Sequence, residues 1–277
     1  MQQNVRFQRF LYCSPVGLNV LVPTTAETDF AENIYFFAVL GKANRFGIET
    51  HMSEWSEFTS ALLAFFVLHS VPVRPAVKSR IVSLTSGRFF TFAYSCVSLL
   101  ALGWLIVASS RAPYVEIWPP APWQHVAALV LMLCVCVIIA FALGRPNPFS
   151  FGGSSETGFD PSRAGIVHLH RHPLLLAFFL WASAHLLPNG DLAHVILFGL
   201  FAGFSLLGMK LINRRTRRQI GSKQYEALLM SVQQAPLLRS FALDHPLIRT
   251  LTGFDLFIVL VLLHPLVIGV SPLAVLY

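Results

Sequence analysis

The residues of this sequence that could carry chemistry inside a membrane are histidines. His69, His185 and His264 each fall within a long apolar run, and no Asp, Glu, Lys or Arg lies near the middle of any such run. Ionisable side chains are costly at bilayer depth, so each of the three histidines is a candidate functional residue. The lack of central acids argues against a carboxylate proton relay and against an ion-coupled transporter.

Two of these histidines, His69 and His185, are expected at similar depth. Each lies about 12 residues from one end of its run, or roughly 18 Å at the helical rise of about 1.5 Å per residue. The two helices are expected to be antiparallel, so the depths of the two imidazoles differ by only about 6 Å. Neutral imidazole is a good ligand for haem iron. A bis-histidine b-type haem needs two such histidines on facing helices and no CxxCH attachment motif, and this sequence has no such motif.

The spacing is therefore compatible with a haem b held between His69 and His185. The alternative is that each histidine hydrogen-bonds to a neighbouring helix and has no further role. His264 is followed directly by Pro265, and this pair is more typical of a helix kink.

A second polar cluster precedes the fourth apolar run, at His168, His170, Arg171 and His172. Alternating histidines of this kind could bind a metal ion, and Arg171 with His172 could hold an anionic group. The alternative for the whole cluster is a basic loop at the membrane surface, followed by a proline in the first helical turn at Pro173.

The elements that must position these residues are transmembrane helices. Hydrophobic residues make up 55% of the chain and charged residues only 12%, about half the share of an ordinary soluble domain. The apolar runs have the length of about 20 residues that a helix needs to cross a bilayer. The sequence thus predicts an all-α, polytopic integral membrane helical bundle with about six transmembrane helices, at 57–73, 91–109, 124–143, 173–188, 192–213 and 254–275.

The turn between the fourth and fifth spans has its own signature. Asn189, Gly190 and Asp191 favour a tight turn, and Asp191 can cap the helix that follows. These two spans are therefore expected to form a helical hairpin.

The net charge of +7 indicates orientation rather than nucleic acid binding, because the basic residues gather in alternate loops. We expect an inner (cytoplasmic) membrane protein with the lipid bilayer as its partner, its basic loops in the cytoplasm and both termini outside. The basic residues of the loops after the first, third and fifth spans are Arg74, Lys78, Arg80 and Arg88; Arg145, Arg163 and Arg171; and Arg214, Arg215, Arg217 and Arg218.

The first 51 residues are mixed in character and differ from the rest. We expect residues 1–51 to be an extension, or the product of an upstream choice of start site, and the functional unit to span 52–277, beginning near Met52.

Several blocks of the sequence resemble the NnrU family. One block runs from Phe66 to Pro75 and contains His69, and the strongest runs from Arg171 to Ala193 and contains His185. Further similar blocks, in the same order as in the family, are Tyr94–Leu99, Ala112–Tyr114, Pro122-Trp123, Pro146–Pro148 and Gly208-Met209. The resemblance covers residues 52–277 and supports a single NnrU-like transmembrane domain.

The resemblance implies a link to denitrification, namely nitric oxide and nitrite reduction, either with haem b or as a non-enzymatic accessory factor for expression or assembly of a reductase. Related plant and cyanobacterial proteins are 15-cis-ζ-carotene isomerases, which use haem b on an apolar polyene. Their haem ligands match His69 and His185 here. If this chain is an enzyme, the resemblance implies a haem-dependent cis–trans isomerase.

The sequence Arg171-His172-Pro173 also resembles a motif of membrane methyltransferases. Those enzymes carry a later pair of glutamates, whereas the corresponding stretch here, 214–226, contains the single acid Glu226. This departure argues against S-adenosylmethionine chemistry.

Overall fold

The computed structural model describes residues 55–151, 158–242 and 245–274. Within these ranges the regular structure is helical, without a strand, and Glu116 and Asp191 form an isolated bridge. The predicted all-α class is confirmed for this part of the chain. The expected N-terminal extension, residues 1–51, lies outside the described residues.

Four of the described helices are long and apolar enough to cross a membrane. They are α3 (Gly87–Arg111), α4 (Pro122–Ala142), α7 (Leu192–Ile220) and α10 (Pro246–Ile268). The count rises to five if the bent pair formed by the helix Trp55–Ser70 and α2 (Pro75–Leu84) is one broken span. The expected count of six is not confirmed, because the first and fourth predicted spans differ from uninterrupted full-length helices.

The first predicted span, 57–73, ends early because of two prolines. The helix stops at Ser70, and the chain turns at 71–74 before Pro75 starts α2 at an angle of 74°. Pro72 and Pro75 have no N–H to continue the helical ladder, which accounts for the break. His69 consequently lies in the last turn of its helix.

The fourth predicted span, 173–188, is the helix α6 (Pro173–Leu186) of 14 residues. At about 1.5 Å per residue it is roughly 21 Å long, against about 30 Å of hydrocarbon. Pro173 starts it, and Pro188 lies just beyond its end. In the turn that follows, Asp191 caps α7 by accepting from the N–H of His194 at 3.3 Å, which confirms the predicted cap.

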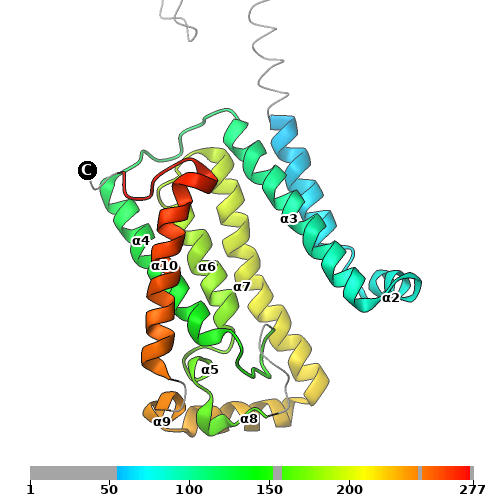
Figure 1. Cartoon of the computed structure of the whole chain (residues 1–277). Coiled ribbons are helices and arrows are strands. Elements are labelled where there is room, and N and C mark those ends of the chain that lie inside the picture. The colour runs from blue at the N-terminus through cyan, green and yellow to red at the C-terminus, as the bar shows by residue number, and fades with distance from the viewer. Residues whose placement is uncertain (1–54, 152–157, 243–244, 275–277) are drawn as a thin grey trace, which may run out of the picture. The chain divides into compact units, whose positions relative to one another are not determined.

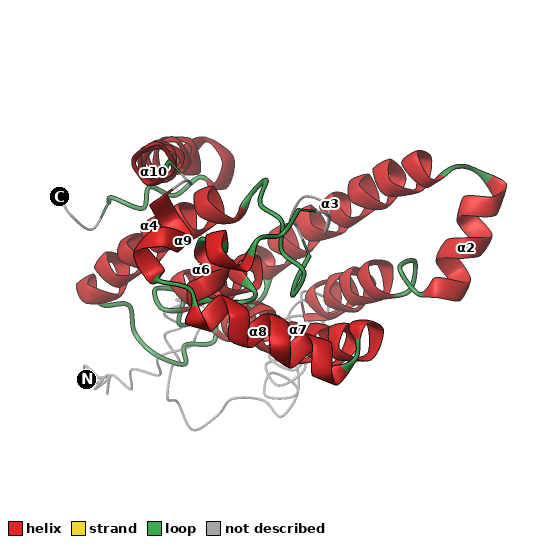
Figure 2. Cartoon of the chain, turned by 90° about the horizontal axis from the view of Figure 1, so that it is seen from below, coloured by secondary structure: helices red, strands yellow, loops and turns green. Residues whose placement is uncertain are grey.

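The helices α4, α6, α7 and α10 run side by side, with α6 packed against both α4 and α7 and with α10 packed against α4 (Figure 1). Four short elements complete the described fold: η1 (Pro161–Arg163), α5 (Ile166–Leu169), α8 (Ser222–Gln234) and α9 (Leu237–Ala242). The elements α8 and α9 lie across the end of the bundle where α7 ends and α10 begins (Figures 1 and 2).

Two apolar cores hold these helices together. The first joins the helix Trp55–Ser70, α3, α6 and α7, and its buried members include Phe58, Leu105, Ala182 and Phe201. The second lies where α4 ends and α8 crosses the bundle, around Phe149 and Tyr225. Many large apolar side chains outside these cores are exposed, as lipid-facing helices require.

Two long helices, α4 and α10, approach each other closely at Gly253, which is buried on α10. A Cβ atom at this position would lie 2.8 Å from the Cα of Val137 on α4. Only glycine fits at this distance, so the α4–α10 contact depends on the missing side chain.

We therefore expect Gly253→Ala to lower the stability of the folded protein, by about 1–3 kcal/mol, because the added methyl group overpacks the interface. The measurement is the thermal unfolding midpoint in detergent. Gly203→Ala on α7 is the matched control, because nothing lies within 4 Å of its Cβ position. If both variants melt alike, the close packing of α4 and α10 is refuted.

Candidate functional site

His185 lies in the last turn of α6, with one ring nitrogen engaged and one free. Its Nδ1 lies 2.8 Å from the carbonyl oxygen of Trp181, one helical turn earlier. A carbonyl can only accept, so Nδ1 carries the proton and the lone pair of the ring is on Nε2. Nε2 makes no hydrogen bond to any residue in the described ranges. This is the arrangement in which a histidine is ready to bind a metal.

Aromatic rings surround this imidazole. The ring centroid of Trp181 lies 4.9 Å from that of His185, and Phe198 on α7 lies 5.2 Å away. Phe201, one turn further along α7, packs on Trp181 at 6.0 Å. The imidazole is therefore partly buried in an apolar wall built by α6 and α7.

His264 on α10 is the histidine that the structure brings to His185. The two ring centroids lie 6.5 Å apart, with an angle of 28° between the ring planes. The Nδ1 of His264 lies 2.6 Å from the carbonyl oxygen of Val270, so its lone pair is also on Nε2. Pro265, expected to mark a kink, lies inside α10, which continues to Ile268.

His69 lies elsewhere, against the helix α3. Its exposed ring stacks on Phe65 at 5.2 Å and contacts the ring of Tyr94 at 5.8 Å. The hydroxyl of Tyr94 donates to the backbone carbonyl of His69 at 3.0 Å. Its surroundings thus come from the helix Trp55–Ser70 and α3, and those of His185 from α6, α7 and α10.

The arrangement does not bring the rings of His69 and His185 together. Ring contacts lead from one to the other only through Phe65, Phe201 and Trp181. Two imidazoles that share one iron must each place a nitrogen about 2 Å from it. No ring contact joins His69 and His185 within the described residues, so their pairing at one iron stays a prediction.

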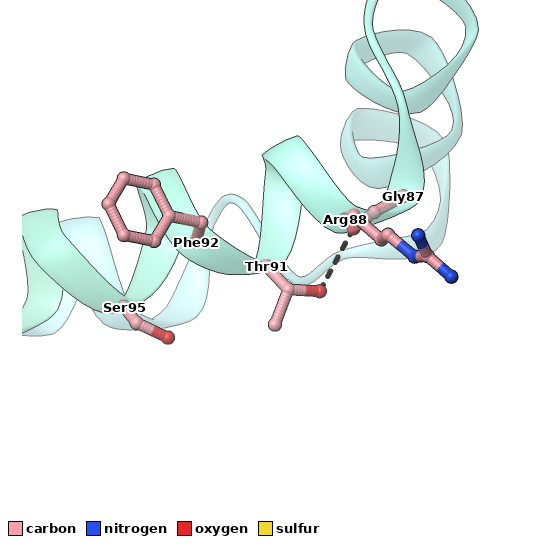
Figure 3. A pocket seen from close by; sticks show the side chains of 5 residues that line it. All are labelled: Gly87, Arg88, Thr91, Phe92 and Ser95. Atoms are coloured by element: carbon pink, nitrogen blue, oxygen red, sulfur yellow. Dashed lines mark hydrogen bonds between the residues drawn. The ribbon is translucent and has the colours of Figure 1, made fainter.

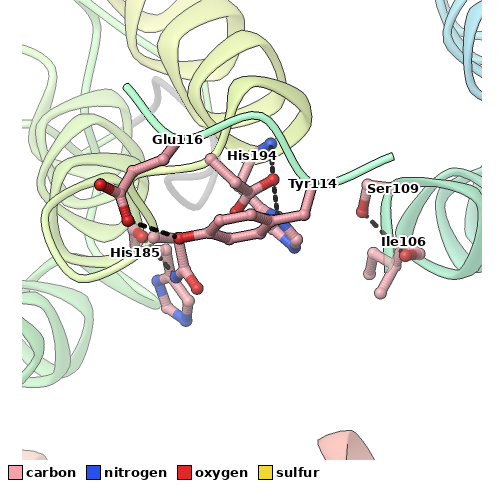
Figure 4. Close-up of polar contacts among 8 residues, drawn as sticks. Ile106, Ser109, Tyr114, Glu116, His185 and His194 are labelled. Carbon is pink, nitrogen blue, oxygen red and sulfur yellow. Dashed lines mark hydrogen bonds and ion pairs between the residues drawn. The ribbon is translucent and has the colours of Figure 1, made fainter. Parts of the chain in front are cut away.

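Several polar contacts lie at the end of the bundle that carries His185 (Figure 4). Asp191 accepts from Nδ1 of His194 at 2.7 Å, and Tyr114 donates to Glu116 at 3.2 Å. Trp118 donates from its indole N–H to the carbonyl of Leu187 at 3.0 Å. Of these bonds, the one from Trp118 joins the loop before α4 to the turn that follows α6, and the backbone N–H of Ile117 adds a second link by donating to the carbonyl of Gly190 at 2.7 Å.

The predicted cluster around Arg171 and His172 forms a buried polar network at the other end of the bundle. His172 is 2% exposed, and its Nε2 lies 3.0 Å from Oδ1 of Asn213 on α7. The same oxygen accepts from the hydroxyl of Tyr225 at 2.7 Å, and that hydroxyl accepts from Arg171 at 3.0 Å. Asn147, in the loop after α4, connects that loop to the network by donating to the carbonyl of Arg171 at 3.0 Å.

The histidines of this cluster make separate hydrogen bonds, although the rings of His170 and His172 lie 6.2 Å apart. His168 pairs with Ser240 through Nδ1 (3.3 Å), and Nδ1 of His170 accepts from the backbone N–H of His172 (3.2 Å). Throughout the described part of the chain, no group of three or more His, Cys, Asp or Glu side chains is placed to hold a metal ion. The expected metal site at these alternating histidines is therefore not supported. The guanidinium of Arg171 donates to the hydroxyl of Tyr225, and an anionic ligand at Arg171 stays a prediction.

The sequence analysis missed Asn213 and Tyr225, which hold this network together. Asn213 is a polar residue at the end of an apolar run, directly before the arginines 214 and 215. A polar residue at that position could have been singled out from the sequence. Its contact with Tyr225, 12 residues later, could not, because it depends on how α8 packs against the end of α7. Arg217 also lies over the ring of Tyr225, at 4.9 Å, and pairs with Glu226 at 2.6 Å.

A shallow hollow of about 620 Å³ lies along the first half of α3 (Figure 3). Its lining residues are Gly87, Arg88, Thr91, Phe92 and Ser95. The hydroxyl of Thr91 donates to the carbonyl of Gly87 at 3.0 Å and so faces its own helix. The hollow contains no histidine and no acid, and it is separate from the histidine sites.

The long apolar helices and the partly buried histidine between them place this protein in the class of α-helical membrane proteins. Residues 57–272 match the family model described as NnrU protein. The match covers most of the chain, which therefore belongs to the NnrU family. No curated protein and no solved structure shows a significant match to it.

Removing the Tyr225 hydroxyl tests the polar network. Tyr225→Phe removes the partner of the Arg171 guanidinium and leaves Oδ1 of Asn213 with His172 alone. We expect this loss to cost about 1–3 kcal/mol and to lower the thermal unfolding midpoint. Tyr114→Phe removes an exposed hydroxyl that bonds to Glu116 and is the matched control, expected to change little. Equal midpoints for the two variants would rule out a structural role for the network.

The network also predicts a pH dependence of stability. Burial lowers the pKa of His172, because the charged form loses water. Below pH about 6.5, the ordinary histidine value, the unfolded chain takes up a proton that folded His172 resists. The unfolding midpoint should therefore fall as the pH is lowered from 7.5 to 5.5, and fall less in His172→Gln. An unchanged slope in this variant would contradict the assignment.

Proposed function

We propose that this NnrU-family protein binds haem b within its membrane helices, with His185 as an axial ligand, and serves nitric oxide or nitrite reduction. The observation that carries the proposal is the state of the His185 imidazole. Its Nδ1–H is held by the Trp181 carbonyl, and its Nε2 lone pair is free. In metal sites, a ligating histidine is oriented in the same way through its second nitrogen.

The surroundings of His185 support this assignment. Trp181 and Phe198 place aromatic rings within 5.2 Å of the imidazole, and an apolar, aromatic environment suits the face of a porphyrin. When bound, a haem supplies an iron that can bind nitric oxide or exchange electrons. The residues of this chain provide the imidazole, fix its orientation and exclude water from it.

The role in denitrification rests on the family rather than on geometry. The family model matches residues 57–272, and both histidine-containing blocks lie inside that range. We propose an inner-membrane location with the loops that carry the basic residues on the cytoplasmic side. The polar network of Arg171 and His172 would then face the cytoplasm.

The purified protein is expected to show a Soret absorption band after expression with adequate haem supply. His185→Ala should lose most of that band, because it removes the free Nε2. His125→Ala is the matched control: His125 also lies within a long apolar helix and also places Nδ1 near the carbonyl four residues earlier, at 3.3 Å. A wild-type protein without a Soret band refutes the proposal, as does a His185→Ala variant with full haem content.

A further inference from the structure

The bend after Ser70 leaves an apolar hollow between three segments of the chain, which we call the bend hollow. The helix Trp55–Ser70 stops there, and α2 turns away at 74° and packs against α3 (Figure 1). The hollow has a volume of about 270 Å³. The side chains that line it come from both sides of the bend and from α3, and they include Leu68, Pro72, Ile81, Phe90, Ala93 and Val97.

Contacts of Tyr94 hold the walls of the bend hollow together. Its hydroxyl donates to the backbone carbonyl of His69 at 3.0 Å, which joins the end of the helix Trp55–Ser70 to α3. Its ring stacks on that of Phe90, with the centroids 5.9 Å apart and 6° between the ring planes. This hydroxyl is the one polar side-chain atom among the lining residues, and it is already bonded to the backbone. The bend hollow therefore suits the hydrocarbon part of a ligand.

The size and the opening of the bend hollow limit what it can hold. Pockets that enclose a whole small molecule have volumes of about 300–1,000 Å³. At about 270 Å³ the bend hollow has room for part of a ligand, such as a stretch of one acyl chain. Two of its lining side chains, Phe89 and Val97, are 56% and 40% exposed. The hollow is therefore open to the lipid that surrounds these helices.

A lysine lies at the edge of the bend hollow. The ammonium group of Lys78 on α2 lies 5.6 Å from the centroid of the Phe90 ring, within the range of a cation–π contact. No acid occurs in residues 58–115, and Lys78 has no acidic partner in the described part of the chain. Three further basic residues lie within ten positions of it, namely Arg74, Arg80 and Arg88. The positive charge beside the hollow is therefore not compensated by the protein.

We propose that the bend hollow binds an acyl chain of an anionic phospholipid whose phosphate group is held by Lys78. The bilayer supplies this ligand, because α2 follows an apolar helix directly and begins in a basic loop, at the depth where lipid headgroups lie. The negative headgroup matches the uncompensated lysine, and the apolar hollow matches the chain beneath it. A zwitterionic lipid offers the same chain without the net negative charge. The site is separate from His185 and does not depend on a bound haem.

The test adds dioleoylphosphatidylglycerol or dioleoylphosphatidylcholine to the purified full-length protein in neutral detergent and measures lipid retention by native mass spectrometry. The wild type should bind the anionic lipid more tightly than the zwitterionic one. Lys78→Gln should weaken binding of the anionic lipid about fivefold, the usual share of one basic side chain at an anionic surface. Lys223→Gln, which changes an exposed lysine on α8, is the matched control and should bind as the wild type does.

A second variant tests the hollow itself. Ala93→Phe places a ring in the space of the acyl chain and should weaken binding of both lipids. Leu99→Phe adds bulk on an exposed face of the same helix and should change neither. Equal binding of the two lipids by the wild type overturns the proposal, as does wild-type affinity in Lys78→Gln or in folded Ala93→Phe. Because Lys78 is exposed, its replacement leaves the fold intact and decides the question even where Ala93→Phe does not fold.

Discussion

The backbone carbonyls at the ends of the helices need hydrogen-bond donors, and the side chains that supply these donors connect one segment of the protein to another. The last turns of a helix leave carbonyl oxygens without intrahelical partners, and an apolar surrounding offers no water to satisfy them. Side chains from other segments supply the donors. Tyr94 bonds to the carbonyl of His69, and Arg249 bonds to those of Ala140 and Leu143 at the end of α4.

The same requirement fixes the candidate site. Near the end of α6, Asn189 donates to the carbonyl of His185 at 2.7 Å, and Trp118 donates to that of Leu187. The imidazoles of His185 and His264 are themselves donors to backbone carbonyls. Each histidine therefore stabilises its helix with one nitrogen and presents the other. In the proposed function, the ligand is bound by a nitrogen that does not hydrogen-bond to the backbone.

The two ends of the bundle differ in how their polar groups are arranged. At the end with α8, the side chains of His172, Asn213 and Tyr225 hydrogen-bond to one another, and most of their polar atoms are therefore not available to a ligand. At the opposite end, the imidazole of His185 lies beside Trp181, Phe198 and His264 and keeps a free lone pair. The first arrangement stabilises the connection of α6, α7 and α8, and the second is the one suited to a ligand.

The sequence by itself determined the helical class, the position of most long helices and the cap at Asp191. Apolar runs, prolines and short polar turns act locally, so they can be recognised along the chain. It also singled out His69, His185 and His264 as histidines within apolar runs, because their neighbours in sequence are apolar. The bend after Ser70 was harder to foresee, since prolines at 72 and 75 permit a turn of any angle.

Only the tertiary structure decided which histidines meet. Helical rise gives the depth of a residue but neither the direction of its side chain nor the helix that it faces. His69 and His185 were expected at similar depth, yet the side chains of Phe65, Phe201 and Trp181 lie between them in the chain of ring contacts. His264 reaches His185 because α10 packs on α4 at Gly253 and α6 packs on the same helix. Contacts between residues so distant in sequence follow from the packing of whole helices, which no local pattern encodes.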